Sequence, residues 1–337
     1  MNTSELEKIA RAMVAPGKGI LAADESHGTI TKRFQALGIE STEETRRTYR
    51  EMFFSSDACA EHVSGVILYD ETIRQSASDG TPFPKYLNDR GIIPGIKVDT
   101  GAKDLAGHPG EKITEGLDGL RERLKEYHDL GGRFAKWRAV ITIGDGIPSR
   151  GCLEGNAHGL ARYAALCQEA GIVPIVEPEV LMDGKHTIDR CQEVTESILE
   201  EVFNQLRHQR VHLEGMVLKP NMVISATDCP QQASVAEVAE RTVATLKRLV
   251  PSAVPGIAFL SGGQSDEAAT AHLDAMNRLG DLPWELTFSY GRALQAAAMK
   301  AWSGKADALA AGAEAFRHRA RMNSAARSGR YESAMEK

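Results

Sequence analysis

The sequence of 337 residues has few cysteines and no long apolar run. Its five cysteines form no C-x-x-C pair, which argues against a disulfide framework or a cysteine-rich zinc site and favours a reducing compartment. They are Cys59, Cys152, Cys167, Cys191 and Cys229. No stretch approaches the ~20 apolar residues of a membrane span. We therefore expect a cytoplasmic protein with no membrane partner.

Charge of one sign is not in large excess either. The chain has 40 Lys and Arg against 46 Asp and Glu, a formal net charge of −6. Such a chain lacks the overall basic character that attracts nucleic acids or anionic membranes. We expect no nucleic-acid partner, and any phosphate group must be bound by a local basic cluster.

We expect no signal peptide at the N-terminus, because its first residues have a helical pattern instead. Ser4 and Glu7 have the spacing of a capping box, and an apolar stripe runs from Leu6 to Met13. We expect an amphipathic helix here, capped at its N-terminus by Ser4.

Eight short apolar runs follow, and helical patterns closed by glycine lie between most of them. The runs cover residues 19–24, 65–69, 92–99, 134–141, 172–177, 215–219, 256–261 and 286–290. This alternation predicts an α/β fold, a (β/α)8 TIM barrel with an additional N-terminal helix. The alternative, a doubly wound open sheet, would show fewer strands and a Gly-rich first turn. We expect one barrel domain over residues 1–326 and a mobile C-terminal tail over 327–337, where the apolar pattern is lost.

One of these runs ends in a lysine, Lys219, followed by Pro220. The proline keeps the lysine extended and lacks the N–H that would continue the ladder. Burial and a second cation, Lys136, disfavour the charged form of such a lysine, and a neutral amine is a nucleophile for carbonyl carbon. The alternative is a lysine that caps its strand and extends into solvent.

Polar side chains also stand at the ends of nearly all the remaining runs. In a barrel these ends meet around one hollow. They are Asp24, Lys97, Lys136, Arg138, Glu177, Glu179, Ser261 and Ser289. So many buried charges would be costly in a core built for stability alone, so we interpret them as a site. We expect Glu177 to act as an acid/base with a raised pKa, Glu179 to balance Lys136, and Asp24 to accept a proton from a substrate hydroxyl. The alternative is a structural network of ion pairs.

Two glycine-bearing loops, 261–264 and 289–292, follow the seventh and eighth runs and open helices. Backbone N–H groups in such loops and at helix N-termini bind anions, and Arg292 can add a bidentate clamp. A second basic cluster, Lys97 and Arg138 with Ser26 and Thr29, can take another phosphate, unless it is only a solvated rim. No His, Cys and Asp set has metal-ligand spacing, so we expect no metal.

Seven segments in order resemble the class I (Schiff-base) fructose-bisphosphate aldolases, over about residues 10–330. They are Gly19–Ser26, Gly95–Asp99, Ala135–Arg138, Pro174–Glu179, Leu218–Val223, Phe259–Gln264 and Phe288–Leu294. The resemblance implies a TIM barrel, usually a homotetramer, without a metal or other cofactor. It implies reversible cleavage of fructose 1,6-bisphosphate to dihydroxyacetone phosphate and glyceraldehyde 3-phosphate in glycolysis and gluconeogenesis. Another phosphorylated ketose, such as fructose 1-phosphate, is the alternative substrate.

The same resemblance implies roles for individual residues. Lys219 would form the Schiff base, with Glu177 as its general acid/base, Lys136 beside it and Asp24 as the base for the C4 hydroxyl. The implied substrate-binding residues are Ser26, Thr29, Arg33, Lys97, Arg138, Glu179, Ser261, Gly262, Gly263, Ser289, Gly291 and Arg292.

The chain departs from the family pattern at two points. Thr29 stands where serine is more usual, and the end of the chain, Tyr331 to Lys337, lacks the terminal tyrosine that helps to move the enamine proton in animal members. Two rival hypotheses stay open at this point. A metal-dependent aldolase would need ligands that the spacing does not offer, and a scaffold protein would have no need of the strand-end charges.

Overall fold

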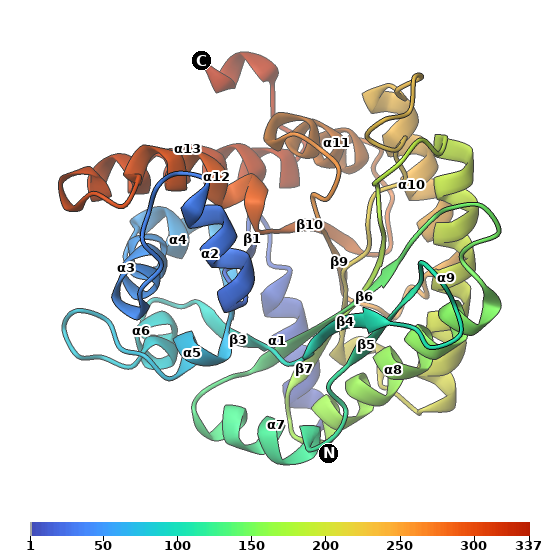
Figure 1. The fold of residues 1–337 in the computed structure, drawn as a ribbon, viewed down its shortest axis with the longest axis horizontal. Helices are drawn as coiled ribbons and strands as arrows, with labels where there is room; N and C mark the ends of the chain where they lie inside the picture. Colours follow the sequence, from blue (N-terminus) through green and yellow to red (C-terminus); the bar gives the residue numbers. More distant parts are fainter. Residues whose placement is uncertain (1) are drawn as a thin grey trace.

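The computed structural model describes residues 2–337 and shows eight parallel strands closed into a barrel, with helices around it (Figure 1). The strands follow one another around the barrel in the order β1-β10-β9-β8-β7-β6-β3-β2. Their bounds are β1 Gly19–Ala22, β2 Val63–Leu68, β3 Ile93–Lys97, β6 Phe134–Ile141, β7 Val173–Val180, β8 Val217–Leu218, β9 Gly256–Phe259 and β10 Glu285–Tyr290. Each falls within or beside one of the eight apolar runs, so the predicted (β/α)8 barrel is confirmed.

Apart from α1, Thr3–Met13, the helices lie around the outside of the barrel, and the longer ones turn an apolar face inward. They are α2 His27–Gln35, α3 Glu43–Phe54, α4 Asp57–His62, α5 Asp70–Ile73, α6 Phe83–Asp89, α7 Leu120–Asp129, α8 Arg150–Glu169, α9 Ile188–His208, α10 Val235–Leu249, α11 Asp266–Arg278, α12 Arg292–Trp302 and α13 Leu309–Arg327, with 3₁₀ turns at Leu213–Gly215, Ala306–Ala308 and Ser333–Glu336. Several begin at a Ser or Thr whose side chain accepts a hydrogen bond from a backbone N–H of the first turn, which stabilises the helix start. Ser149, Thr187, Ser234 and Ser265 do so for α8, α9, α10 and α11.

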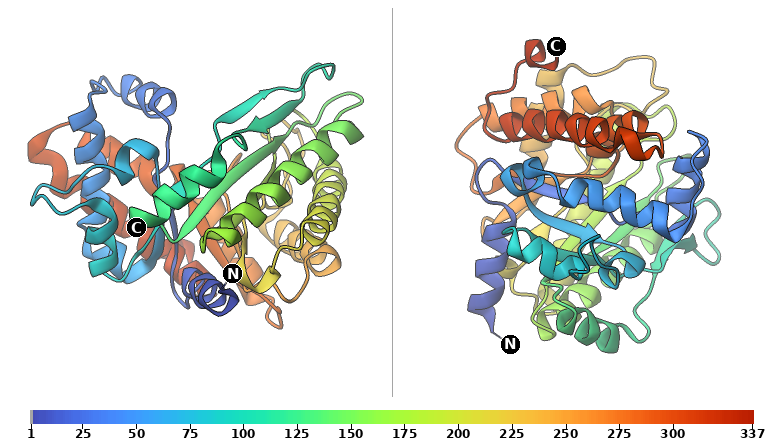
Figure 2. Two further views of the ribbon diagram at one scale, coloured as in Figure 1. Left: turned by 90° about the horizontal axis from the view of Figure 1, so that it is seen from below. Right: turned by 90° about the vertical axis from the view of Figure 1, so that its left-hand side faces the viewer.

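A short antiparallel hairpin, β4 Gly101–Asp104 and β5 Lys112–Glu115, lies outside the barrel. The sequence did not lead us to expect it, because its strands are four residues long and largely polar. In the right-hand view of Figure 2, α1 runs along one edge of the molecule and α2 along the opposite edge. The barrel therefore has two different ends, which we call the floor, beside α1, and the mouth, beside α2.

The floor is closed by α1. Asn2 is the N-cap of this helix, and its side chain accepts a hydrogen bond from the N–H of Glu5 at 3.3 Å, so the predicted capping box of Ser4 and Glu7 is wrong. The apolar stripe is confirmed, because Leu6 and Met13 are fully buried. They join an apolar cluster with inward-facing strand residues, including Ile20, Phe134, Val173, Ile175 and Val217.

The ring of Phe134 fills the floor next to two glycines. A Cβ atom built on Gly95 would lie 2.3 Å from the ring, and one on Gly65 would lie 2.9 Å from it. Any side chain at Gly95 would therefore overlap with the ring. The floor is packed so closely that β2 and β3 must lack side chains where β6 places an aromatic one.

The residues after α13 pack on the body of the protein. Tyr331 is buried, its N–H donates to Asp274 at 2.8 Å, and its hydroxyl donates to Glu336 at 3.0 Å. The Glu336 carboxylate also accepts from the buried Arg319 at 2.6 Å. This segment makes specific contacts here, whereas the loss of apolar pattern suggested a tail without them.

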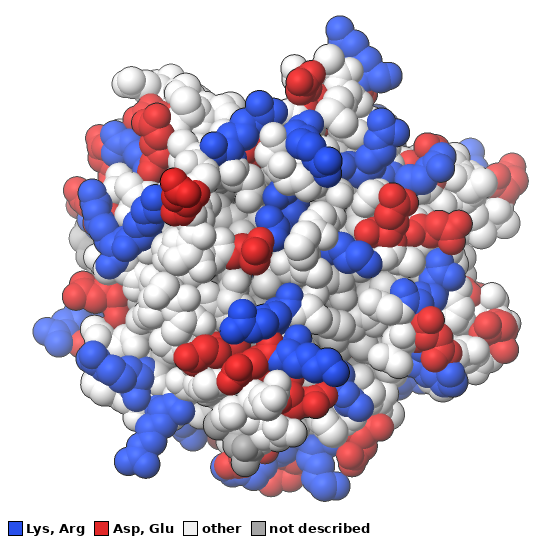
Figure 3. Space-filling view, turned by 180° about the vertical axis from the view of Figure 1, so that it is seen from behind, with Lys and Arg blue, Asp and Glu red and all other residues white. Residues whose placement is uncertain are grey.

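Charges of both signs are interspersed on the face opposite to that of Figure 1, as Figure 3 shows. This distribution agrees with the nearly balanced composition. Among the helices of residues 2–337, none is both long and apolar enough to cross a membrane.

Candidate active site

A hollow of about 320 Å³ opens at the mouth, where the carboxyl ends of the strands meet. Nearly all the predicted site residues line it, although they come from all parts of the chain. They are Asp24, Ser26, Thr29, Arg33, Lys97, Lys136, Arg138, Glu177, Glu179, Lys219, Ser261, Gly262, Ser289, Gly291 and Arg292. Gly263 lines an adjoining hollow that shares Arg138, Glu179, Gly262 and Arg292 with the first.

Lys219 lies directly after β8 and is 3% exposed, so the interpretation as a solvent-exposed cap is wrong. Its backbone N–H donates to the carbonyl of Val176 at 2.8 Å, which fixes it to β7 although β8 itself is only two residues long. Its Nζ lies 3.0 Å from Oε1 of Glu177. A buried amine within proton-transfer distance of a carboxylate is the arrangement that a nucleophilic lysine needs.

Lys136, on β6, links Glu177 to a second carboxylate. Its Nζ lies 2.7 Å from Oδ2 of Asp24 and 3.4 Å from Oε2 of Glu177. The four side chains Lys219, Glu177, Lys136 and Asp24 form a continuous buried row of alternating charge across the hollow. The alternation offsets the cost of taking each charge out of water.

This row shifts the pKa values of its members. Burial would raise the pKa of Asp24, but the charges of Lys136 and Lys219 lower it to about 2. Burial would also raise the pKa of Glu177, yet Lys136, Lys219 and Arg138 outweigh it, so its pKa is lowered. The expected raised pKa of Glu177 is therefore wrong, because the sequence did not show how many cations surround it. Burial would lower the pKa of Lys136, but Asp24, Glu177 and Asp99 raise it, so this lysine stays charged.

The second carboxylate of β7 has a different partner from the one we expected. Glu179 pairs with Nε of Arg138, two residues beyond Lys136 on the neighbouring strand. The expectation that it balances Lys136 is wrong, since Asp24 and Glu177 already do so. The parallel register sets Arg138 opposite Glu177 and Val140 opposite Glu179, which leaves the long Arg138 side chain within reach of Glu179.

The seventh and eighth strands supply a candidate phosphate site. Gly263 has a φ of +74°, and a Cβ atom there would lie 2.4 Å from Met182, so only glycine fits this turn. The guanidinium of Arg292 donates to the carbonyl of Gln264, and α12 begins at Arg292 with its N-terminus at the hollow. Cation, glycine turn and helix N-terminus together make a site for an anion.

The other side of the mouth is formed by the start of α2 and the end of β3. Ser26 is the N-cap of α2, and its hydroxyl lies 3.2 Å from that of Thr29. Lys97 pairs with Asp99 at 2.9 Å. Glu25, which we did not predict, also lines the hollow and pairs with Arg33 at 2.6 Å. Its place directly after Asp24 is the only sequence signal that could have indicated it.

Tyr331 is the last tyrosine of the chain, so it is the residue to compare with the terminal tyrosine of animal members. It is not among the side chains that line the mouth hollow. Across residues 2–337, we also find no group of three His, Cys, Asp or Glu side chains arranged to hold a metal ion.

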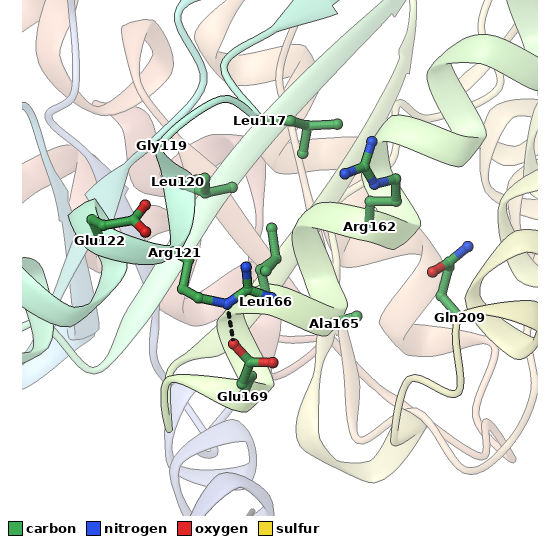
Figure 4. A pocket seen from close by; sticks show the side chains of 10 residues that line it. All are labelled: Leu117, Gly119, Leu120, Arg121, Glu122, Arg162, Ala165, Leu166, Glu169 and Gln209. Carbon is green, nitrogen blue, oxygen red and sulfur yellow. Dashed lines mark hydrogen bonds and ion pairs between the residues drawn. The ribbon is translucent and has the colours of Figure 1, made fainter.

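A separate hollow of about 290 Å³ lies on the outer helix layer, against α7 and α8 (Figure 4). Arg121 and Glu169 pair across it at 2.6 Å, and both side chains are more than half exposed. This hollow is a solvated surface groove, whereas the charges at the mouth are buried. We therefore take the mouth as the site.

Comparisons with known proteins place these observations in a family. The family model for fructose-bisphosphate aldolase class-I matches residues 5–337. The chain is 63% identical to a probable fructose-bisphosphate aldolase class 1 of Xanthomonas campestris pv. campestris, over 90% of this chain and 91% of that protein. It is 52% identical to fructose-bisphosphate aldolase C of Mus musculus, over 97% and 91% of the two chains. A solved structure of the fructose-bisphosphate aldolase from Plasmodium falciparum, in complex with TRAP and a small molecule inhibitor, aligns with a TM-score of 0.96 at 47% identity, over 98% of this chain and 96% of that chain.

Proposed function

The chain belongs to the class I fructose-bisphosphate aldolase family, and from this membership we propose that Lys219 is the lysine that forms the Schiff base with the substrate. The protein is a lyase, a fructose-bisphosphate aldolase with a role in glycolysis. Chemistry of this class uses a lysine in place of a metal.

Each step up to the breaking of the C3–C4 bond has a candidate group in the mouth. Glu177, 3.0 Å from Nζ, takes the proton of Lys219, and the amine attacks the C2 ketone. Loss of water gives a protonated imine, with Glu177 returning the proton to the departing hydroxyl. The imine then draws in the electron pair of the C3–C4 bond while ionised Asp24 accepts the proton of the C4 hydroxyl, which releases glyceraldehyde 3-phosphate. Protonation of the enamine and hydrolysis of the imine release dihydroxyacetone phosphate.

The two phosphates of the substrate fit the two sides of the mouth. We place the C1 phosphate at the 261–263 turn with Gly291 and Arg292, where backbone N–H groups and a guanidinium converge. We place the C6 phosphate near Ser26, Lys97 and Arg138, beside the N-terminus of α2. Thr29, Arg33, Glu179 and Ser289 complete the lining as further substrate contacts.

The single observation that supports this assignment best is the burial of Lys219 within 3.0 Å of Glu177. Borohydride reduction in the presence of dihydroxyacetone phosphate should fix a covalent adduct, and peptide mapping should find it on Lys219. The exposed Lys247, on α10, offers a matched control, because K247M should label as the wild type does and K219M should not label at all. An adduct on any other lysine would overturn the assignment.

Fructose 1,6-bisphosphate is the better candidate substrate than fructose 1-phosphate, because the relatives carry the bisphosphate in their names and the mouth has basic groups on both sides. Comparing kcat/KM for the two sugars tests this preference. A higher value for fructose 1-phosphate would reverse it.

Three further properties are part of the proposal. The family resemblance supports a homotetramer, which sedimentation would test, and the name of a cytosolic relative from Arabidopsis thaliana supports a cytoplasmic location.

The third property is the domain organisation: a barrel domain over residues 1–326 and a C-terminal segment, residues 327–337, that detaches in solution. Limited proteolysis should cut first within residues 327–337, and resistance there would contradict the expected mobility.

A further inference from the structure

A buried histidine on α11, His272, is bonded to the glutamine that ends the candidate phosphate turn. Its Nδ1–H donates to Oε1 of Gln264 at 2.7 Å, and the two residues are 8% and 6% exposed. Burial lowers the pKa of His272 to about 4, so the ring is neutral over the physiological range. A neutral hydrogen bond shielded from water holds both partners in one rotamer.

Gln264 in turn positions the guanidinium of Arg292 through a hydrogen bond. Its backbone carbonyl accepts a hydrogen bond from Arg292, and the Ser261 carbonyl lies 3.5 Å from the same nitrogen. The backbone N–H of Gln264 donates back to Ser261 at 3.3 Å, which closes the turn. The direction in which Arg292 points therefore depends on where the Gln264 backbone lies.

The turn is supported from two sides. On one side Met182 packs against Gly263, so closely that a Cβ atom on Gly263 would lie 2.4 Å from it. On the other side the Gln264 side chain is tied to His272, almost two turns into the 13-residue helix α11. That helix packs on α13 and is rigidly placed by Arg319, which donates to the carbonyl of Asp266 at 3.2 Å and to the hydroxyl of Thr270 at 2.6 Å.

We propose that His272 is a positioning residue for phosphate binding, acting through Gln264 on Arg292 without touching the substrate. The inference rests on the proposed function, in which Arg292 binds the C1 phosphate. His272 would thereby affect the binding of the phosphomonoester at the ketose end of the substrate. The imine chemistry at Lys219 is separate from it, because the row of charges from Lys219 to Asp24 does not pass through α11.

Two variants separate positioning from simple packing. H272F keeps a planar ring, somewhat larger than imidazole, and removes both nitrogens, whereas H272N keeps an N–H close to the place of Nδ1. H272F should raise the KM for fructose 1,6-bisphosphate by about 3- to 10-fold, the scale of one neutral hydrogen bond, with kcat changed by less than about twofold. H272N should stay within about twofold of the wild type in both constants.

A second readout follows the phosphate directly. The concentration of dihydroxyacetone phosphate that half-saturates borohydride trapping on Lys219 should rise for H272F, whereas the value for unphosphorylated dihydroxyacetone should not change. Equal losses with both ketones, or an H272N variant as impaired as H272F, would show that His272 only packs the core and would overturn the inference.

R292K tests the premise in the same assays. If R292K leaves the KM unchanged, the assignment of Arg292 to the phosphate fails, and the inference fails with it. If R292K raises the KM and H272F does not, the proposed function stands and the role of His272 is refuted.

Discussion

The floor and the mouth of the barrel are built by the same strands but hold opposite kinds of side chain. Along the inner face of β7, Val173 and Ile175 belong to the apolar floor, and Glu177 and Glu179, the next two residues on that face, line the mouth. On the next strand Val217 lies in the floor and Lys219, two residues later, in the mouth. A single step of the pleat therefore separates residues that stabilise the fold from residues that do its chemistry.

The contrast teaches how the charges at the mouth are tolerated. The floor excludes water below them and packs tightly enough to hold the strands in register. The mouth can then bury a row of alternating charges whose positions are set by the backbone. Changes at the floor should alter stability and leave the chemistry intact, whereas changes at the mouth should act first on the chemistry.

The largest effect should come from removing the nucleophile at the mouth. K219M should lower kcat by roughly 10⁴-fold or more, equivalent to about 5.5 kcal/mol of activation free energy, because no other amine replaces it. Its thermal midpoint should stay within about 5 °C of the wild type, because Glu177 keeps its ion pair with Lys136 at 3.4 Å and methionine fills much of the space of the lysine. Steady-state kinetics and a melting curve check both statements. A variant that retained a tenth of the activity would contradict the role of Lys219.

The next effect belongs to the floor. F134A should lower the free energy of unfolding by about 3–5 kcal/mol, because the ring fills the space beside Gly65 and Gly95 and would leave a cavity. Urea unfolding measures the loss, and kcat per folded molecule should be unchanged at a temperature where the variant is folded. A fall in kcat without a fall in stability would erase the distinction between the two ends.

A third test uses acid. The pKa of Asp24 is lowered from its ordinary 3.8 to about 2 in the folded protein, so its charge stabilises the fold above pH 4. This contribution, about 2 kcal/mol at neutral pH, is lost as the pH falls from about 4 to about 2. D24N has no such titration, so its stability should fall less steeply than that of the wild type over this range. Parallel curves of unfolding free energy against pH would show that Asp24 is not held in its charged form.

The smallest effect is a single methylene at the floor. I20V should cost about 0.5–1.5 kcal/mol of unfolding free energy, since Ile20 is fully buried in the apolar cluster beneath the mouth. Substrate KM and kcat should not change. A measurable change in KM would mean that the packing of the floor reaches the mouth.

The sequence was enough to predict the barrel, because eight apolar runs separated by amphipathic helices permit few other arrangements. It was also enough to place the site, because a run such as the one that ends at Lys219 fixes which residue lies at the carboxyl end of its strand. The polar hairpin of β4 and β5 escaped detection, since short exposed strands have no apolar alternation to reveal them.

The pairing within the site could not be predicted from the sequence. Which carboxylate faces Lys136 depends on the stagger between β1, β6 and β7, and this stagger brought Asp24 to it and left Glu179 to Arg138. The sign of the pKa shift at Glu177 followed from the same geometry. The role we propose for His272 could not be predicted from the sequence either. Its hydrogen bond to Gln264 depends on how the turn folds back on α11.

The backbone hydrogen bonds around Lys219 have a consequence for hydrogen exchange at the centre of the site. Its amide donates to β7, and the carbonyl of Pro220 accepts from Leu260 at 3.2 Å, so the chain is held on both sides at the centre of the barrel. Amide protons in such a place exchange with solvent only when most of the molecule unfolds. Local fraying at the rim should therefore leave the backbone of Lys219 in place, and the amide proton of Lys219 should exchange only through loss of the whole fold.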